Sequence, residues 1–235
     1  MPKILAFSGP DGTGKSTYAN MMTKLLKENY IPRRIWIKNA HMLGYLILWL
    51  LGKLNPEHVV KSTSGTFVTS SLSNNERLWS WTEFISVVIK LFAVRFFSIM
   101  SRFIHAKVYV LIADRYLLDS MVHICISILL SKPSDLKLMQ WRIFRLCRCL
   151  PFRVLKSLLL KSAITVFLDG EVNVLVRRNT VAGKADPYNY MVLQRYLYLN
   201  LVSIMGIPVI YINTTYKSVK EVFVEILTVI KKKAF

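Results

Sequence analysis

Five short apolar runs, separated by longer stretches of helical periodicity, constrain the fold of this 235-residue chain more than any other feature. The predicted strands are Lys3–Ser8, Arg33–Lys38, Val108–Ala113, Ala163–Leu168 and Pro208–Ile212. Their apolar residues are mostly consecutive, as in strands that are buried on both faces of a parallel sheet. Strands that alternate with helices predict an α/β fold, in which a doubly wound, parallel five-stranded sheet is flanked by helices.

The stretches between these runs predict helices, and the chain length predicts a single domain over residues 1–235. The main helices are expected at Lys15–Asn29, Glu76–Ile104, Tyr188–Met205 and Ser218–Lys233. Gly206 and Pro208 should end the third helix and begin the last strand. Residues 39–73 pass from an apolar stretch into a Ser/Thr-rich one, which indicates an insertion.

The hydropathy of the chain raises the possibility of a membrane span, but no segment fits one. A helical span needs about 20 consecutive apolar residues. Asn39–Gly52 is too short, and Tyr196–Tyr216 contains polar residues, a glycine and Pro208. The first predicted strand begins at Lys3, which leaves no room for a signal peptide. With three cysteines in no metal-binding spacing, we expect a cytoplasmic protein with reduced thiols.

The charge of the chain indicates its partners. It contains 32 Lys and Arg but 13 Asp and Glu, giving a net charge of +19. Such a charge favours polyanionic partners, which include nucleotide phosphates, nucleic acids and an anionic membrane surface. The hydrophobic content of 53% excludes a disordered chain.

The segment Gly9–Thr17, Gly-Pro-Asp-Gly-Thr-Gly-Lys-Ser-Thr, matches the pattern of a phosphate-binding P-loop, G-x-x-x-x-G-K-[ST]. A predicted strand enters it and a predicted helix leaves it, which is the context that this loop requires. Its glycines let backbone amides surround a phosphate at the positive end of the helix. Lys15 would neutralise the β- and γ-phosphates, and Ser16 would hold Mg²⁺. The predicted ATP-binding residues are Gly9, Asp11, Gly12, Thr13, Gly14, Lys15, Ser16 and Thr17.

Asp114-Arg115-Tyr116 follows directly on a buried apolar run. An aspartate at the carboxyl end of a parallel strand lies at the edge where α/β sheets bind ligands. Asp114 therefore fits the Mg²⁺ side of a P-loop enzyme, and Arg115 offers a fork for a second phosphate. The alternative is that Asp114 caps the next helix while Arg115 lies on the surface.

Taken together, these motifs closely resemble those of thymidylate kinases and related P-loop nucleoside-monophosphate kinases. The P-loop and Asp114-Arg115-Tyr116, with Ser120 beyond, carry the resemblance most specifically. Leu168–Val172, leading to Arg177 and Arg178, is similar to the strand that enters the lid of that family. Arg95 matches an arginine of the family's long acceptor-site helix. The resemblance covers nearly the whole chain.

The resemblance implies a P-loop NTPase fold and Mg²⁺-dependent phosphoryl transfer from ATP to a nucleoside monophosphate, with conversion of dTMP to dTDP first among the candidates. It implies a lid at residues 177–187 and a homodimer formed through the long helix. The implied catalytic residues are Lys15, Arg115, Arg177 and Arg178. The implied acceptor-binding residues are Asp11, Arg95, Arg115 and Tyr116, and the metal ligands are Ser16 and Asp114.

The segment Trp36–His41 departs from the family, because nothing in it matches the Arg-Glu-Pro-Gly-Gly-like loop that contacts the acceptor phosphate. Two alternatives therefore stay open. One is a kinase of this fold that acts on a sugar or lipid-linked acceptor at a membrane, and the other is a non-catalytic ATP-binding module. The apolar run Tyr45–Leu51, if exposed, would contact a membrane or a second subunit.

The stretch from Trp141 to Lys161 interleaves cations with bulky apolar residues. We interpret it as helices packed on the sheet, whose Arg and Lys heads are solvated while their stems cover apolar surface. Binding to an anionic membrane surface is the alternative. A nucleic acid would also suit such a pattern, but we do not expect it as the partner.

Overall fold

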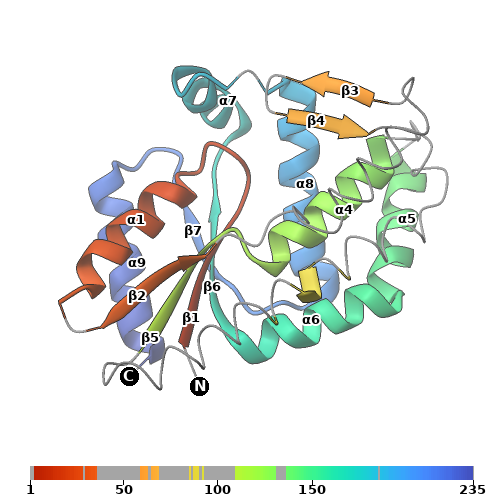
Figure 1. Ribbon diagram of the computed structural model, residues 1–235. Helices are drawn as coiled ribbons and strands as arrows, with labels where there is room; N and C mark the ends of the chain where they lie inside the picture. Colours follow the sequence, from red (N-terminus) through yellow and green to blue (C-terminus); the bar gives the residue numbers. More distant parts are fainter. Residues whose placement is uncertain are drawn as a thin grey trace.

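The computed structural model describes residues 3–28, 30–35, 59–62, 65–68, 85, 87–89, 92, 109–130, 136–184 and 186–234. Its centre is a five-stranded sheet in the order β2-β5-β1-β6-β7, and all neighbouring strands are parallel (Figure 1). The strands are β1 (Lys3–Ser8), β2 (Ile31–Ile35), β5 (Tyr109–Asp114), β6 (Ala163–Asp169) and β7 (Ile210–Asn213). The predicted parallel sheet is thus confirmed, although β2 begins earlier than expected.

The helices follow the strands as an α/β fold requires. They are α1 (Lys15–Leu26), α4 (Leu117–Leu130), α5 (Leu136–Arg148), α6 (Leu150–Ser162), α7 (Val172–Val181), α8 (Tyr188–Met205) and α9 (Val219–Ala234). Helix α8 has the predicted bounds, and Gly206 ends it in the left-handed conformation with φ +57°. The Gly206 amide donates to the Ser203 carbonyl and the Ile207 amide to the Val202 carbonyl, which satisfies two of the last carbonyls of the helix. Of the predicted helix 76–104, residues 85, 87–89 and 92 are described, and they are helical.

Two apolar layers bury the two faces of the sheet. Along β1, Leu5 and Phe7 pack with α1 and α9, whereas Ile4 and Ala6 pack with the helices on the other face. Helices α4, α5, α6 and α8 contribute to that second layer. Consecutive apolar residues are therefore needed in each central strand, because alternate side chains point into different layers.

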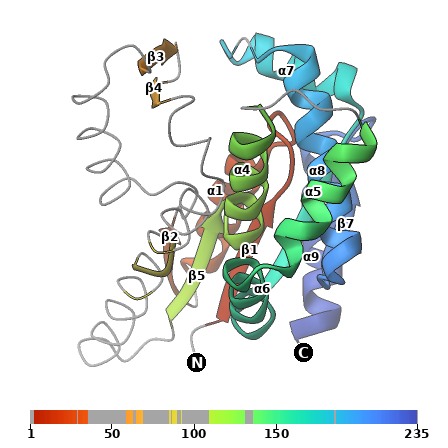
Figure 2. The same cartoon turned by 90° about the vertical axis from the view of Figure 1, so that its right-hand side faces the viewer.

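A small two-stranded antiparallel ladder stands apart from the main sheet (Figure 2). It consists of β3 (Val59–Ser62) and β4 (Gly65–Val68), with Val59 opposite Val68. It lies inside the predicted insertion 39–73, for which the sequence indicated no strands. The segments Trp36–His41 and Tyr45–Leu51 lie outside the described residues.

In the described part of the chain, none of the helices combines the length and the hydropathy that crossing a bilayer requires. The cysteines, Cys125, Cys147 and Cys149, are free thiols. Burial raises the pKa of the Cys147 thiol to about 12, so it stays protonated at neutral pH.

Candidate functional site

The P-loop, Gly9–Thr17, connects β1 to α1 and lies close against neighbouring backbone. Gly9 has φ +146° and Gly12 has φ +83°. A Cβ atom at Gly9 would lie 2.0 Å from the Leu168 carbonyl oxygen, and one at Gly12 would lie 2.6 Å from that of Leu175. Both contacts and both backbone angles require glycine. Gly14 precedes α1 without a side-chain cap, so the first amides of this helix face the loop.

Lys15 places its ammonium group inside the loop. Its Nζ donates to the carbonyl oxygens of Gly9 at 2.6 Å and Pro10 at 2.7 Å, and lies 3.5 Å from Asp11 Oδ1. The Lys15 side chain is buried, whereas Ser16 and Thr17 are exposed. The Thr13 hydroxyl is also buried and donates to the Pro10 carbonyl at 2.8 Å, which holds the turn of the loop.

Asp11 is fixed by two residues from distant parts of the chain. Gln194 of α8 accepts from the Asp11 amide at 2.8 Å and donates to Asp11 Oδ2 at 3.0 Å. The Arg115 guanidinium donates to Asp11 Oδ1. The loop is therefore tied both to α8 and to the end of β5. Gln194 was not predicted, since its position on a helix carries no local signal of this contact.

Arg115 follows β5 and turns back toward the loop. Its φ of 73° is positive, and its amide donates to the Phe7 carbonyl at 3.1 Å. Burial lowers the pKa of Arg115, but the charge and hydrogen bond of Asp11, together with the nearby Tyr198 and Asp119, outweigh burial and leave the pKa raised. Among the described residues its buried Nη1 has no hydrogen-bond partner. Arg115 thus lines the site as a cationic donor. The alternative interpretation, which placed Arg115 on the surface, is wrong.

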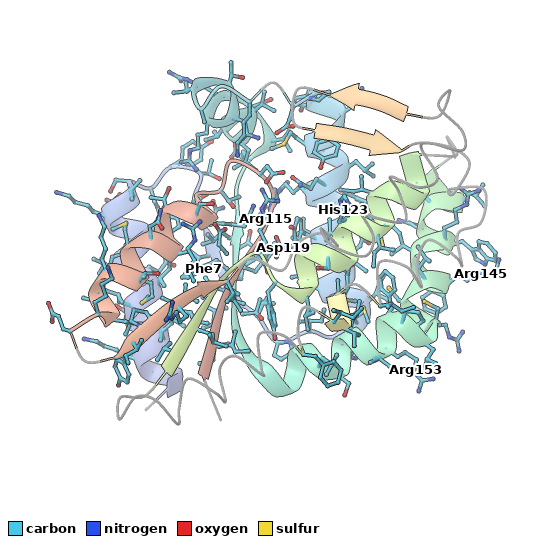
Figure 3. The ribbon with its side chains drawn as sticks, viewed as in Figure 1. Phe7, Arg115, Asp119, His123, Arg145 and Arg153 are labelled. Atoms are coloured by element: carbon cyan, nitrogen blue, oxygen red, sulfur yellow. The ribbon has the colours of Figure 1, made fainter. Side chains whose placement is uncertain are left out.

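Asp119 holds the start of α4 against the end of β1, where the P-loop begins. It accepts hydrogen bonds from the Tyr116 amide at 3.0 Å, the Ser8 hydroxyl at 2.5 Å and the Tyr198 hydroxyl at 2.6 Å. Figure 3 shows Phe7, Arg115 and Asp119 gathered where the P-loop, β5 and α4 meet. An aspartate three residues after a helix N-cap is a local signal that could have identified this contact.

Asp119, and not Asp114, therefore caps α4. Asp114 ends β5, and its Oδ2 accepts from the Arg34 guanidinium, which also donates to Asn20 Oδ1 at 2.6 Å. Asp114 Oδ1 is buried and has no hydrogen-bond partner in the described part of the chain. A buried carboxylate oxygen of this kind is suited to a cation or to a water molecule bound to one.

A cavity of about 510 Å³ lies beside the P-loop. Its lining residues are Ser16, Arg34, Ile35, Asp114, Arg115 and Lys184. Within the described ranges no three His, Cys, Asp or Glu side chains cluster to hold a metal. Ser16 and the open oxygen of Asp114 nevertheless fit Mg²⁺, because this ion usually keeps waters and takes only one or two protein ligands beside phosphate oxygens. Arg34 and Lys184 line this cavity without having been predicted.

The remaining predicted residues are placed as follows. Arg178 of α7 donates to Thr214 Oγ1 at 3.2 Å, to the Thr214 carbonyl at 2.8 Å and to the Thr215 carbonyl at 3.3 Å. Arg177 is exposed on the same helix and forms no hydrogen bond with a described residue. Tyr116 is buried among the apolar residues that pack under α4. Arg95 lies outside the described residues.

Asp169 organises the carboxyl ends of β6 and β7. Arg195 binds it through two bonds of 2.8 and 2.9 Å, and the Tyr211 hydroxyl donates to it at 2.8 Å. Burial raises the pKa of Asp169, but the hydrogen bonds from Arg195 and Tyr211 leave the pKa below its ordinary value of 3.8. Its carbonyl accepts from the Thr214 amide at 2.8 Å, so this cluster positions the loop that Arg178 contacts.

We expect Asp169→Asn to lower the free energy of unfolding by about 2 kcal/mol at neutral pH, because a buried charged pair loses one partner. Since the pKa of Asp169 is lower in the folded state, its contribution is present above pH 4 and is lost as the pH falls through the folded pKa. Urea unfolding between pH 7 and pH 3 should therefore show a difference that shrinks in acid. Glu225→Gln, in the exposed Lys217–Glu225 pair, is the control. A difference independent of pH would contradict this role of the Asp169 charge.

Comparison with solved structures gives matches along almost the whole chain. The thymidylate kinase from Candida albicans is 16% identical with a TM-score of 0.58, and the match covers 99% of this chain and 92% of that one. The YorR protein from Bacillus subtilis, in complex with phosphorylated GDP, is 14% identical with a TM-score of 0.52 over 98% and 97%. The deoxyadenosine kinase from M. mycoides with bound dCTP is 14% identical with a TM-score of 0.50 over 98% and 99%.

The chain has a P-loop NTPase α/β fold. The resemblance predicted from the motifs is thus confirmed at the level of the fold, and the structural neighbours are thymidylate and deoxyadenosine kinases and related proteins. No protein-family model and no curated protein matches the sequence.

Proposed function

We propose that this protein is a kinase that transfers the γ-phosphoryl group of ATP to a nucleoside monophosphate, with dTMP as the preferred acceptor. The observation that carries the proposal is the glycine loop with Lys15 inside it, next to a cavity that Asp114 and Arg115 line. The same fold in a thymidylate kinase supports the choice of reaction.

On the donor side, the amides of the P-loop and of the first turn of α1 bind the phosphates of ATP. Lys15 exchanges its bonds to the loop carbonyls for phosphate oxygens and compensates their charge. Ser16 and Asp114 would hold Mg²⁺, which when bound neutralises charge on the β- and γ-phosphates. Gln194 ties Asp11 to α8 through two hydrogen bonds, so this part of the loop is held in place before a ligand binds.

On the acceptor side, three cations line a cavity that has one acidic residue. Arg115, whose Nη1 is buried without a partner among the described residues, is positioned to bind the acceptor phosphate. An oxygen of that phosphate attacks the γ-phosphorus while the bond to the β,γ-bridging oxygen of ATP breaks, which yields ADP and a nucleoside diphosphate. The acceptor phosphate is already ionised, so no general base is needed, and positioning and charge stabilisation do the work. Arg177 and Arg178 of the lid, Arg95 and Tyr116 stay assigned to the acceptor and the transferred group by resemblance.

An acceptor screen tests this function. Purified protein with ATP and Mg²⁺ is offered each common ribo- and deoxyribonucleoside monophosphate, together with thymidine and deoxyadenosine, and ADP release is measured. We expect dTMP to accelerate ADP release at least tenfold over ATP alone, a difference of about 1.4 kcal/mol in the barrier, with dTDP as the product. Acceleration only by nucleosides would overturn the choice of a monophosphate acceptor. Lack of acceleration by every nucleotide and nucleoside would overturn the nucleotide kinase and favour the sugar or lipid-linked acceptor or the non-catalytic module.

A further inference from the structure

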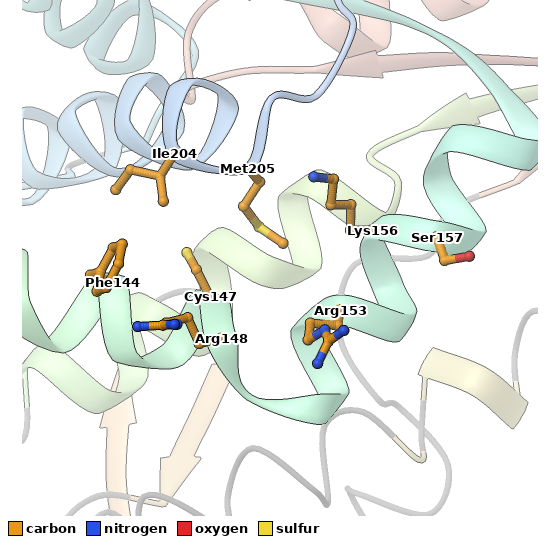
Figure 4. Close-up of a pocket in the computed structure, with 8 residues that line it drawn as sticks. All are labelled: Phe144, Cys147, Arg148, Arg153, Lys156, Ser157, Ile204 and Met205. Atoms are coloured by element: carbon orange, nitrogen blue, oxygen red, sulfur yellow. The ribbon is translucent and has the colours of Figure 1, made fainter.

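A second cavity, of about 740 Å³, lies between α5, α6 and the end of α8 (Figure 4). Its lining residues are Phe144, Cys147, Arg148, Arg153, Lys156, Ser157, Ile204 and Met205. It shares none of these residues with the cavity beside the P-loop. We call it the α5–α6 groove. The proposed phosphoryl transfer makes no use of it.

The groove is positively charged. It contains Arg148, Arg153 and Lys156, and no described acidic side chain forms an ion pair with any of the three. Arg148 lies over the ring of Phe144, with its guanidinium carbon 5.3 Å from the ring centroid. Helices α5 and α6 contain no Asp or Glu. The local field therefore attracts an anion.

The outer face of α5 adds an apolar surface to these charges. Leu138, Trp141 and Phe144 are 44%, 54% and 49% exposed, and Leu150, at the start of α6, is 59% exposed. The three α5 residues recur at intervals of three along the helix and so share one side of it, and Arg145 and Arg148 follow them on the same side. The opposite side of α5 already supplies Ile143 and Cys147 to the core.

These exposures correct the interpretation made from the sequence. The stretch from Trp141 to Lys161 does form helices that pack onto the domain, and Arg145, Arg148 and Arg153 are exposed. Large apolar side chains stand about half exposed on the surface among them, however, so the cations cover these side chains only in part. Arg145 lies over the ring of Trp141, 5.3 Å from its centroid, and leaves that side chain half exposed.

We propose that the α5–α6 groove and the outer face of α5 form a docking surface for an anionic phospholipid membrane. Arg148, Arg153 and Lys156 bind lipid phosphates, while Trp141 and Phe144 enter the headgroup region. Charge complementarity selects an anionic partner, and alternating cations and large apolar side chains are the pattern of a helix that lies on a membrane surface. Leu138 and Leu150 favour lipid over a polynucleotide, because aliphatic side chains cannot stack with bases as aromatic rings do.

Vesicle flotation of the full chain tests the proposal. The protein should float with phosphatidylcholine vesicles that contain about 30% phosphatidylserine, and not with phosphatidylcholine alone. Reversing two groove charges, R148E with R153E, should lower partitioning at least tenfold, since each basic residue near an anionic surface contributes about fivefold. The matched control is K231E with K232E on α9, which makes the same change in net charge on the other side of the domain (Figure 1). The control should float like the wild type.

Two further variants keep the test decisive. R148Q with R153Q removes the charges without reversing them and replaces the first pair if that pair does not fold. W141S should also weaken flotation, because it removes an apolar contact and leaves the charges in place. If R148E with R153E and K231E with K232E lose flotation equally, net charge explains the binding and the proposal is overturned. Equal flotation with neutral vesicles would overturn it as well. Binding of a single-stranded oligonucleotide that R148E with R153E abolishes, without vesicle binding by the wild type, would assign the surface to nucleic acid instead.

Discussion

Replacing Lys15 with methionine is expected to lower the rate of ATP-dependent phosphoryl transfer by about a thousandfold. The methionine keeps an unbranched stem but lacks the ammonium group, which lies within 2.7 Å of two carbonyl oxygens of the loop. Without this cation, the charge that develops on the transferred phosphoryl group loses a preorganised donor, and the loss of one such donor costs a hundred- to a thousandfold in rate, about 3 to 4 kcal/mol. The measurement is ADP release with saturating acceptor.

Lys24→Met makes the same chemical change on an exposed position of the same helix, and it should leave the rate within about twofold of the wild type. Because Lys15 also bonds the loop carbonyls, the unfolding midpoint of both variants is compared with that of the wild type. A folded Lys15→Met protein that retains more than a tenth of the activity would contradict the proposed role of the lysine.

Replacing Arg115 with alanine should lower kcat/KM for the acceptor by about a hundredfold or more. Arg115 combines a largely buried side chain, an Nη1 atom without a hydrogen-bond partner among the described residues and a position on the cavity wall. Its removal takes away the cation that faces the acceptor phosphate, and it also frees Asp11 Oδ1 from an ion pair. Steady-state kinetics with varied acceptor and saturating ATP would show the loss.

Arg115→Lys separates charge from shape, since lysine keeps the positive charge but lacks the planar fork. It should recover part of the activity that alanine loses. Arg33→Ala, an exposed arginine on β2, is the matched control and should change kcat/KM by less than about twofold. A change below tenfold in Arg115→Ala, about 1.4 kcal/mol, would mean that this side chain does not contact the acceptor in the transition state.

The elements that the sequence located well are those with strong local signals. Strand β1 and helix α8 have their predicted bounds, since a consecutive apolar run ends at the P-loop and Gly206 ends the helix. The phosphate-binding loop is equally local, because its glycines and Lys15 are adjacent in the chain. The strands β3 and β4 could not be located, as their short antiparallel pairing has no distinct pattern in a Ser/Thr-rich stretch.

The residues that the sequence missed depend on contacts between distant segments. Gln194 lies 183 positions from the Asp11 that it binds, and Arg34 lies 80 positions from Asp114. In a chain with 32 Lys and Arg, nothing local distinguishes Arg34 or Lys184 from solvated cations. The parallel sheet brings Arg34 to Asp114 by placing the ends of β2 and β5 at one edge, whereas Gln194 comes from α8 and Lys184 from the turn after α7.

The central claim is that the amides of the glycine loop and the Lys15 ammonium bind the phosphates of ATP. Calorimetric titration of the purified protein with a non-hydrolysable ATP analogue and Mg²⁺ tests it most directly. We predict saturable binding at one site per chain and at least tenfold weaker binding by Lys15→Met, because a charge-assisted contact contributes about 1.5 to 3 kcal/mol. The absence of any binding heat across several temperatures, or identical affinity in the two proteins, would contradict the account.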